Sequence, residues 1–404
     1  MLLLAMAALI RGPVYAYPSV GWFFVSWLPG ELPWLFALIQ VAGTFFFVFM
    51  SNDVGMFEVC LFFISAITLV IWLNLHLKTF RSELVLRTAL VDSLGGDFYE
   101  ALPPDIGVAS PSVIQNRDWL KPFGYRRPGV ERIKDIIYGD AERNKLDIYR
   151  GTKISSPPLG RPVVLHIHGG AWMIGNKYQQ AQPLIKYLAQ NGWICLDINY
   201  RLATTDRYPA CIIDVKKAIV WVKENIERYG GDSSFIVITG GSAGGHLSAL
   251  AALTPNSAEF QPGFEMKDTQ VQAVIPIYGI YDLEARPGDG PLMHQLLERY
   301  VMPCEFKSGP DRWRNASPIN RAGNLDLPIF VVHGVNDCVV PVKQAQEFVK
   351  AVKHKNSAPV VYAELLGAQH GFDIFHSVRT EFYIEAVGKF LHYCYANYCS
   401  DRKK

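Results

Sequence analysis

A serine flanked by glycines, in the run Gly-Gly-Ser-Ala-Gly at residues 240–244, is the part of this chain that most directly indicates chemistry. The apolar segment 235–239 before it predicts a strand, and the segment 246–253 after it predicts a helix. In this strand–turn–helix context the glycines permit a sharp turn that exposes the Ser242 hydroxyl. The unpaired N–H groups at the start of the helix then favour negative charge beside it. We therefore predict Ser242 to be a nucleophile rather than an ordinary helix N-cap.

A serine hydroxyl needs a base to accept its proton and a carboxylate to orient that base. Asp337 follows the predicted strand 329–332, and His370 follows the predicted strand 360–364. Reacting groups gather at the carboxyl ends of strands in open α/β sheets, so we expect both side chains to meet Ser242 there. The chain order of the three residues is serine, then aspartate, then histidine.

Other side chains compete for the roles of acid and base. Asp373 is an alternative acid, but the position directly after a strand favours Asp337, which could otherwise only cap the helix near residue 343. His246 lies one turn into the helix after the serine, where its side chain should not reach back. The remaining competitors for the base are His333 and His376.

A second run of small residues, His-Gly-Gly-Ala-Trp at 168–172, follows the predicted strand 163–167. Small residues let backbone N–H groups approach the negative oxygen that forms when a carbonyl is attacked, and losing one such donor typically costs about 100- to 1,000-fold in rate. We expect His168 to order this loop rather than to transfer protons. The candidate oxyanion donors are the N–H groups of Gly169, Gly170, Ala171 and Ala243.

Strands and helices alternate from about residue 131 onward, as an α/β fold requires. Unbroken rather than alternating hydrophobicity indicates strands that are buried on both faces. We expect a mainly parallel, doubly wound sheet. Its strands are predicted at 133–138, 145–149, 163–167, 193–198, 235–239, 271–277, 329–332 and 360–364, and the main helices at 179–190, 211–228, 343–354 and 376–396.

Two uncharged apolar segments near the N-terminus, 34–50 and 59–77, are each long enough to cross the hydrocarbon core of a bilayer, which is about 30 Å thick. Only five charged residues precede Arg81. Trp34 and Trp72 lie near the ends of these segments, as interfacial aromatic residues do. We predict a transmembrane helical hairpin, with two buried core helices of a soluble protein as the alternative.

Residues 1–28 are also apolar but are interrupted by prolines. They are open to three interpretations: a third, broken helix, an interfacial segment, or a signal peptide that lacks a positive first region. Lys78, Arg81 and Arg87 follow the second apolar segment, so the positive-inside tendency predicts that the C-terminal domain faces the cytoplasm. The expected organisation is a membrane anchor at 1–80, a linker or cap region at 81–130, and a catalytic domain at 131–398.

Charge and cysteine usage exclude several classes of protein. The net charge of +2, without a basic stripe interleaved with aromatic residues, argues against nucleic acid as a partner. The seven cysteines have no metal-ligand spacing, and we expect neither a metal nor a cofactor. Two or three apolar helices without an intramembrane cluster of ionisable residues do not suit a channel or transporter.

Residues 131–395 resemble the hormone-sensitive-lipase-like branch of the α/β-hydrolase carboxylesterases and lipases, and are most similar to members with an N-terminal membrane segment. The resemblance rests on the two runs above and on Asp-Ile-Asn-Tyr-Arg-Leu at 197–202, Tyr-Gly-Gly-Asp at 229–232 and His-Gly-Phe at 370–372. It implies an α/β-hydrolase fold and serine-dependent hydrolysis of carboxylic esters through an acyl-enzyme. With a membrane anchor, a lipophilic ester substrate and contact with membrane lipid are expected.

Two positions depart from the family pattern. The family's oxyanion motif is usually His-Gly-Gly-Gly, and Ala171 replaces the last glycine, so that its Cβ and Trp172 should narrow the pocket. Gly241 stands where the family often has an acidic residue. Similar motifs occur in arylformamidases and prenylcysteine methylesterases, so hydrolysis of an amide or a prenylcysteine methyl ester is an alternative. A receptor or adhesion module with an inactive hydrolase fold is the alternative from another class.

Overall fold

One sheet of eight strands organises the computed structural model, which describes residues 1–10, 12–13, 17–51, 55–99, 117–125, 127–152, 160–284, 291–323 and 326–402. The strand order is β1-β2-β4-β3-β5-β6-β7-β8. β1 pairs antiparallel with β2, and β2 pairs antiparallel with β4, whereas all later pairs are parallel. The strands are β1 (Val130–Ile137), β2 (Lys145–Gly151), β3 (Arg161–Ile167), β4 (Ile194–Ile198), β5 (Gly231–Gly241), β6 (Ala273–Ile277), β7 (Ile329–Gly334) and β8 (Val360–Leu365).

The mainly parallel, doubly wound sheet predicted from the sequence is confirmed. Each strand lies at its expected place within a few residues, because β3 to β8 are unbroken apolar runs that the sheet buries. The helices of the described part are α1 (Leu2–Leu9), α2 (Tyr17–Glu31), α3 (Pro33–Met50), α4 (Met56–Leu94), α5 (Gln182–Gln190), α6 (Ala210–Asn225), α7 (Ala243–Leu253), α8 (Pro291–Leu296), α9 (Pro310–Ala316), α10 (Lys343–Lys353) and α11 (Val378–Asp401).

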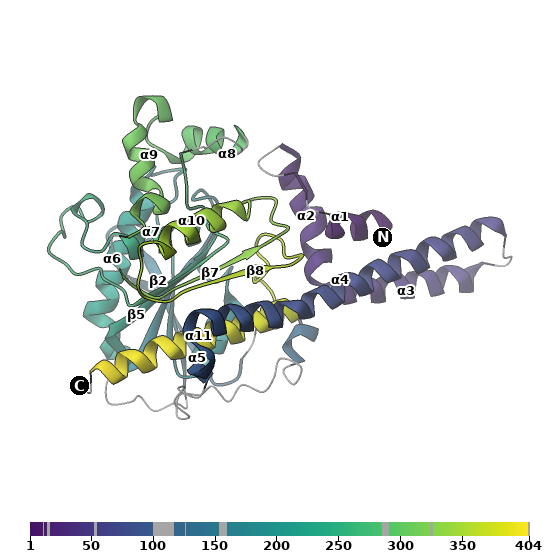
Figure 1. The fold of residues 1–404 in the computed structure, drawn as a ribbon, viewed down its shortest axis with the longest axis horizontal. Helices are drawn as coiled ribbons and strands as arrows, with labels where there is room; N and C mark the ends of the chain where they lie inside the picture. Colours follow the sequence, from purple (N-terminus) through teal and green to yellow (C-terminus); the bar gives the residue numbers. More distant parts are fainter. Residues whose placement is uncertain are drawn as a thin grey trace.

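Helices cover the sheet on both faces and create two hydrophobic cores. One core lies between the sheet and α6, α7 and α10, and includes Ile219, Leu250 and Phe348. The other lies between the sheet and α5, α11 and the C-terminal part of α4, and includes Leu86 and Leu90. The yellow α11 runs beside the end of α4 across this second face (Figure 1). An N-terminal helix therefore supplies part of the core of the α/β domain.

The two long apolar helices α3 and α4 lie side by side and project away from the sheet (Figure 1). Both are long and apolar enough to cross a membrane, as predicted for a hairpin. α4 continues without a break across residue 80, where the expected anchor ends, and reaches the sheet, where Ser93 Oγ donates to the carbonyl of Val360 at 3.2 Å. The connector residues 52–54, and residues 100–116 of the expected linker, lie outside the described part.

The interface between α3 and α4 is polar, whereas their outward faces are apolar. Gln40 Nε2 donates to the Ser65 carbonyl at 2.8 Å, and Thr44 Oγ1 hydrogen-bonds with Ser65 Oγ at 2.9 Å. Trp72 is fully buried and donates its indole N–H to Gln40 Oε1 at 2.9 Å. The expectation that Trp72 is an interfacial aromatic residue is therefore wrong, because the amide of Gln40 offers its N–H a partner inside the helix pair.

Residues 1–28, whose structure the sequence left open, contain α1 and most of α2. Residues 11 and 14–16 between them lie outside the described part. α1 packs against α2 and α4, and α2 continues toward the carboxyl ends of β7 and β8 (Figure 1). The segment 284–318 holds α8 and α9, and its residues 285–290 are also outside the described part.

Candidate active site

Ser242 lies at the turn between β5 and α7 in a backbone conformation that is rare for a residue with a side chain. Its φ is 59° and its ψ is −122°. Such positive-φ conformations cost about 1–3 kcal/mol and persist only where the surroundings enforce them. Here the N–H of Ser242 donates to the Ile277 carbonyl at 3.0 Å, and its carbonyl accepts from the His246 N–H at 2.9 Å. The turn therefore holds the serine in the geometry expected of an activated nucleophile.

The glycines around Ser242 are required by close contacts between backbones. A Cβ on Gly244 would lie 2.0 Å from the carbonyl oxygen of Ile167, and one on Gly240 would lie 2.5 Å from the same atom. A Cβ on Gly241 would lie 2.5 Å from the Tyr278 hydroxyl. The run Gly-Gly-Ser-Ala-Gly thus fits the space left by β3 and by the residue after β6.

Asp337 and His370 form a hydrogen-bonded pair at the carboxyl ends of β7 and β8. His370 Nδ1–H donates to Asp337 Oδ2 at 2.7 Å. Asp337 is fully buried, and its other oxygen accepts the N–H groups of Val339 at 2.9 Å and Val340 at 2.8 Å. The carboxylate therefore fixes the imidazole in the tautomer that leaves Nε2 available as a proton acceptor.

His333 makes a second contact with the same carboxylate. Burial raises the pKa of Asp337, but the charge of His370 and a hydrogen bond from His333 together lower it by more. The pKa therefore lies well below its usual range. His333 Nε2 lies 3.3 Å from Asp337 Oδ2 and 2.9 Å from the Val340 carbonyl. Asp337 is therefore a permanent anion, as an orienting carboxylate should be.

Ser242 and the Asp337–His370 pair share one edge of the sheet, with Tyr278 between their loops. Tyr278 packs against His370 with ring centroids 4.7 Å apart, and its hydroxyl lies against the backbone at Gly241. Within the described residues, Ser242 Oγ makes no hydrogen bond, and none joins it to His370. Catalytic hydrogen bonds are often long before substrate binds, and tighten in the reacting complex.

The residues expected to bind the oxyanion divide into two groups. Gly169 N–H donates to Gln180 Oε1 at 2.7 Å, so it is occupied, and we correct its expected role from donor to loop support. Gly170 and Ala171 have positive φ values of 118° and 51°, and their N–H groups have no partner within the described residues. Ala243 is the first residue of α7, where backbone N–H groups lack helical partners.

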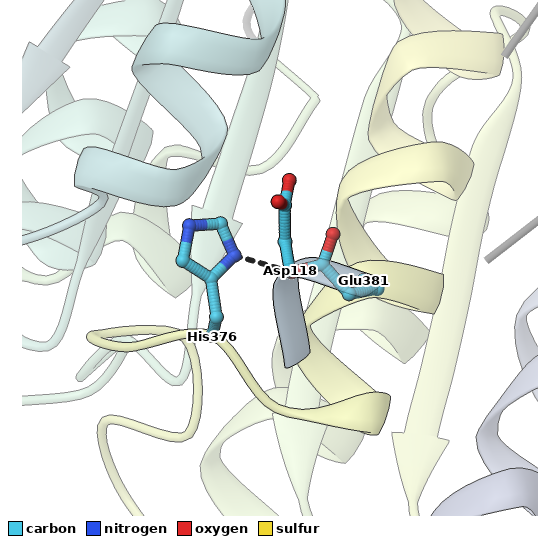
Figure 2. Close-up of side chains that lie close together, drawn as sticks. All are labelled: Asp118, His376 and Glu381. Atoms are coloured by element: carbon cyan, nitrogen blue, oxygen red, sulfur yellow. Dashed lines mark hydrogen bonds and ion pairs between the residues drawn. The ribbon is translucent and has the colours of Figure 1, made fainter. Parts of the chain in front are cut away.

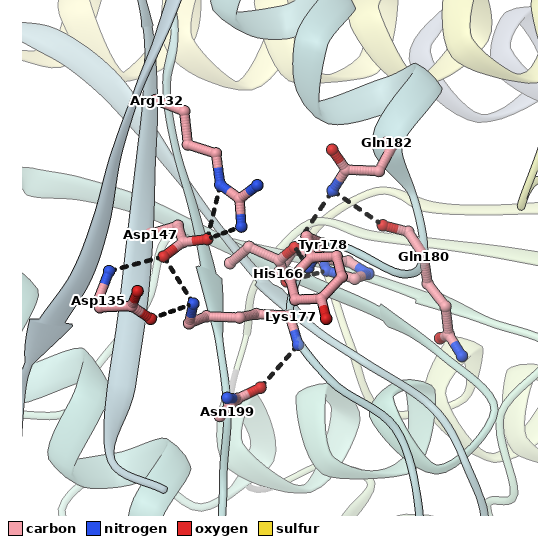
Figure 3. Close-up of polar contacts among 10 residues, drawn as sticks. Arg132, Asp135, Asp147, His166, Lys177, Tyr178, Gln180, Gln182 and Asn199 are labelled. Atoms are coloured by element: carbon pink, nitrogen blue, oxygen red, sulfur yellow. Dashed lines mark hydrogen bonds and ion pairs between the residues drawn. The ribbon is translucent and has the colours of Figure 1, made fainter. Parts of the chain in front are cut away.

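The loop of residues 168–181, which we call the oxyanion loop, is fixed by polar groups at the carboxyl end of β4. Lys177 N–H donates to Asn199 Oδ1 at 2.6 Å, and Tyr178 N–H donates to Asp197 Oδ2 at 2.7 Å. His166 hydrogen-bonds with Asp197 at 2.8 Å. Figure 3 shows this network, together with Gln180 at its border. The start of the run 197–202 therefore has a structural role, because the side chains of Asp197 and Asn199 hold the oxyanion loop in place.

The competing histidines are committed elsewhere. His246 accepts the indole N–H of Trp172 on Nδ1 at 3.1 Å and donates from Nε2 to the Ala316 carbonyl at 2.7 Å. His168 donates to the Gly169 carbonyl at 2.7 Å, and burial lowers the pKa of both histidines to about 4. Trp172 is buried against His246, so its indole packs in the core instead of narrowing a pocket.

The alternative acid, Asp373, accepts the hydroxyl of Tyr278 and has no contact with His370 through hydrogen bonds. Burial raises the pKa of Asp373, whereas the pKa of Asp337 is lowered. A carboxyl group that is harder to ionise is a poorer partner for an imidazole that must become positive. The electrostatics favour Asp337 in the role of the acid.

His376, another competitor, belongs to a cluster with Asp118 and Glu381 whose ligand-type atoms lie within 4.8 Å of one another (Figure 2). His376 hydrogen-bonds with Glu381, and Asp118 forms an ion pair with Arg127 at 2.6 Å. Each group therefore has a protein partner. We assign this cluster no part in the reaction.

Comparisons with known proteins identify the family of this chain. The BD-FAE family model matches residues 146–352. A probable carboxylic ester hydrolase of Mycobacterium tuberculosis, LipM, is 43% identical over 339 residues, covering 80% of this chain and 75% of its own. Esterase LipQ of the same organism is 41% identical and covers 80% of this chain and 77% of its own. An isoprenylcysteine alpha-carbonyl methylesterase of Arabidopsis thaliana is 28% identical and covers 54% of this chain and 52% of its own.

Among solved structures, esterase B from Lactobacillus rhamnosis superposes with a TM-score of 0.56 at 20% identity, and covers 69% of this chain and 90% of its own. This similarity identifies the fold as that of the α/β-hydrolases. With more than two thirds of LipM and LipQ matched above 40% identity, the family is established as well. This chain belongs to the BD-FAE-type, hormone-sensitive-lipase-like family of carboxylic ester hydrolases.

Proposed function

We propose that this chain is a membrane-anchored serine esterase that hydrolyses lipophilic carboxylic esters through an acyl-enzyme on Ser242. The observation that carries the proposal is the pairing of His370 Nδ1 with Asp337 at 2.7 Å, at the sheet edge where Ser242 occupies a strained turn. No other described histidine combines a buried carboxylate partner with a position beside that turn.

The reaction then follows from these groups. His370 Nε2 accepts the Ser242 proton as Oγ attacks the ester carbonyl, and Asp337 stabilises the imidazolium that forms. The N–H groups of Gly170, Ala171 and Ala243 stabilise the oxyanion. His370 gives this proton to the departing alcohol. It then takes a proton from the water that attacks the acyl-enzyme and returns that proton to Ser242 Oγ as the carboxylic acid is released.

Labelling with a fluorophosphonate probe tests the mechanism, because the probe forms a covalent bond only with an activated serine. We expect stoichiometric labelling of the purified full chain together with hydrolysis of 4-nitrophenyl butyrate. Both should be lost in Ser242→Ala. The exposed Ser233, whose hydroxyl donates to Glu227, provides the matched control: Ser233→Ala should retain both. Labelling that persists in Ser242→Ala would refute the proposal.

The membrane anchor is supported by the distribution of polar groups in the α3–α4 pair. The side chains facing solvent include Phe45 at 73% exposure, Phe49 at 76% and Phe63 at 63%, whereas Gln40 and Ser65 hydrogen-bond at the interface. Large apolar side chains outside and polar ones inside are the reverse of a soluble helix pair, and suit a hydrocarbon environment. An active site that is anchored to a membrane in this way would favour esters that partition into the bilayer.

Two experiments test the anchor and its orientation. After carbonate washing at high pH, we expect the full chain to remain with the membrane pellet; release into the supernatant would argue for a soluble protein. Lys78, Arg81 and Arg87 support a cytoplasmic position of the α/β domain. Protease should therefore digest that domain in sealed vesicles with the cytoplasmic side outward, and protection would reverse the orientation.

A second candidate function is hydrolysis of isoprenylcysteine methyl esters. The match to methylesterases of that name, at 28% identity over about half of each chain, favours it. The same three residues would perform the reaction, and methanol would be the leaving group. Turnover of a farnesylcysteine methyl ester, compared with that of a long-chain 4-nitrophenyl ester in the same vesicles, separates the two candidates.

A further inference from the structure

Helix α2, which precedes the apolar hairpin, packs directly against the loops that carry the candidate acid and base. The contacting residues recur along α2 at helical spacing and so share one face. The contacts are the carbonyl of Ser19 with Cys338 Sγ at 3.5 Å, the ring of Phe23 edge-on to His370 with centroids 6.3 Å apart, and the Trp27 indole N–H with the Gly371 carbonyl at 3.0 Å.

Gln369 joins the acid loop to the base loop through one buried amide. Its Oε1 accepts the N–H of Cys338 at 3.0 Å and the N–H of His370 at 3.2 Å. Cys338 directly follows Asp337 in the chain. The position of this one side chain therefore constrains the backbone next to both members of the Asp337–His370 pair.

Gln369 is in turn fixed by two residues of α2. Its Nε2 donates to Ser26 Oγ at 2.9 Å, and its backbone N–H donates to Glu31 Oε1 at 3.3 Å. Glu31 forms a fully buried ion pair with Nη1 of Arg379, and Nη2 of the same guanidinium donates to the Leu366 carbonyl at 3.1 Å. Breaking such a buried pair typically costs about 3–5 kcal/mol, so the end of α2 is held firmly in place.

We propose that α2 is part of the catalytic apparatus: through Ser26 and Glu31 it holds Gln369, and Gln369 is the positioning residue that sets His370 against Asp337. The inference rests on the proposed function, since it requires Asp337 and His370 to serve Ser242. It goes beyond that function, because it gives the N-terminal segment a role in the chemical step as well as in attachment.

The physical reason is that a general base acts only within a narrow range of positions. A displacement of 1 Å in a reacting group can reduce the rate by about 100-fold. The ladder between β7 and β8 ends at Gly334 and Leu365. Beyond it the loops are joined by the Asn336 N–H, which donates to the Ala368 carbonyl at 3.0 Å, and by Gln369, which α2 contacts. Within the described residues, the hydrogen bonds of Gln369 go to backbone N–H groups, to Ser26 and to Glu31, and none goes to the side chains of Ser242, Asp337 or His370, which separates its effect from binding.

Kinetics of the full chain in detergent micelles test the proposal with 4-nitrophenyl butyrate, a soluble ester that does not depend on the membrane. In Gln369→Leu, which keeps the volume and removes the amide, kcat should fall about tenfold or more while KM stays within about twofold. The acid limb of kcat/KM should move to lower pH, since a looser Asp337 contact favours the imidazolium less. A defect in folding alone would not move this limb.

Ser26→Ala removes the acceptor of the Gln369 side chain on α2, together with a hydrogen bond from Ser26 Oγ to the Trp22 carbonyl within α2, and provides a milder variant should Gln369→Leu fold poorly. We expect kcat to fall about threefold, with a shift of the acid limb in the same direction. Ser93→Ala is the matched control, because Ser93 also ties an N-terminal helix to the α/β domain through one hydrogen bond, to Val360, far from the loops. Its kcat should equal that of the wild type. Rates are expressed per serine titrated with fluorophosphonate.

Two outcomes overturn the proposal: wild-type kcat and pH profile in both Ser26→Ala and Gln369→Leu, or an equal loss in Ser93→Ala. Failure of the proposed function looks different. In that case Ser242→Ala would keep its hydrolytic activity and the probe would not label Ser242, whatever the Gln369 variants do. Full activity of both Ser26→Ala and Gln369→Leu, together with an inactive Ser242→Ala, would reject the role of α2 and leave the proposed function in place.

Discussion

The backbone N–H of Gly169 donates to the side-chain carbonyl of Gln180 at 2.7 Å, so the two ends of the oxyanion loop are joined by one hydrogen bond. This bond occupies the N–H of Gly169, whereas those of Gly170 and Ala171 have no partner within the described residues. Gln180 thereby selects which donors of the loop are available.

Replacing Gln180 should therefore impair the chemical step. In Gln180→Leu we expect kcat to fall about tenfold with little change in KM, because a loosened oxyanion loop loses the preorganisation of its donors. Gln190→Leu is the matched control, since Gln190 is exposed on α5 and contacts only Arg127. Steady-state kinetics with 4-nitrophenyl butyrate measure both. Equal rates in the two variants would remove Gln180 from this role.

The two candidate acids should differ strongly on substitution. Asp337→Asn leaves the shape intact but favours the wrong tautomer of His370, so kcat should fall about 10,000-fold, as for other triads. Asp373→Asn keeps an acceptor oxygen for the Tyr278 hydroxyl and should cost less than about tenfold. The ratio of kcat/KM between the variants decides the assignment. A larger loss in Asp373→Asn would reverse it.

Acid should destabilise the fold through its buried neutral histidines. His168 and His246 have pKa values lowered by burial to about 4, below the unfolded value of about 6.5. Between these values the unfolded chain binds more protons, so stability decreases as the pH falls from 6.5 toward 4. Each residue should remove about 2 kcal/mol between pH 7 and pH 5.

The variant His246→Gln checks this expectation, because glutamine can also accept from Trp172 and donate to the Ala316 carbonyl. Denaturant unfolding in detergent at pH 7, 6 and 5 should show a smaller loss of stability in the variant than in the wild type. The same pH dependence in both proteins would show that His246 does not contribute to it.

The close approach of α7 to β3 makes Gly244 intolerant of any side chain. The Cβ of Gly244→Ala would lie 2.0 Å from the Ile167 carbonyl oxygen, and neither backbone can withdraw without distorting the turn at Ser242. We expect a loss of several kcal/mol in stability, together with loss of fluorophosphonate labelling. Gly96→Ala, which meets no atom within 4 Å, is the control and should behave as wild type.

The sequence predicts the sheet well, and it predicts that the candidate residues follow strands, because both leave local signals. Buried strands appear as unbroken apolar runs, and Ser242, Asp337 and His370 each follow such a run. The residues around them are harder to find. The side-chain oxygens of Gln180 and Gln369 accept backbone N–H groups, and no residue pattern records such hydrogen bonds.

Contacts between distant parts of the chain account for the remaining surprises. Glu31 is a single carboxylate in an apolar segment, and a buried carboxylate requires a cationic partner. The sequence near Glu31 does not identify that partner, which is Arg379 at the start of α11. Trp72 resembles an interfacial residue until Gln40, on the neighbouring helix, provides its acceptor. In both cases the deciding partner is known only once the helices are packed.

The unbroken course of α4, from the exposed hairpin to the edge of the sheet, has a mechanical consequence. A flexible linker would let the α/β domain rotate freely above a bilayer, whereas a continuous helix of 39 residues is a rigid connection. If the hairpin is embedded in a bilayer, the tilt of α4 fixes the height and the angle of the Ser242 turn relative to the lipid headgroups. Inserting two residues near Leu77 would rotate the two parts of α4 by about 200° relative to each other, and the contacts of α2 with the loops after β7 and β8 would oppose that rotation.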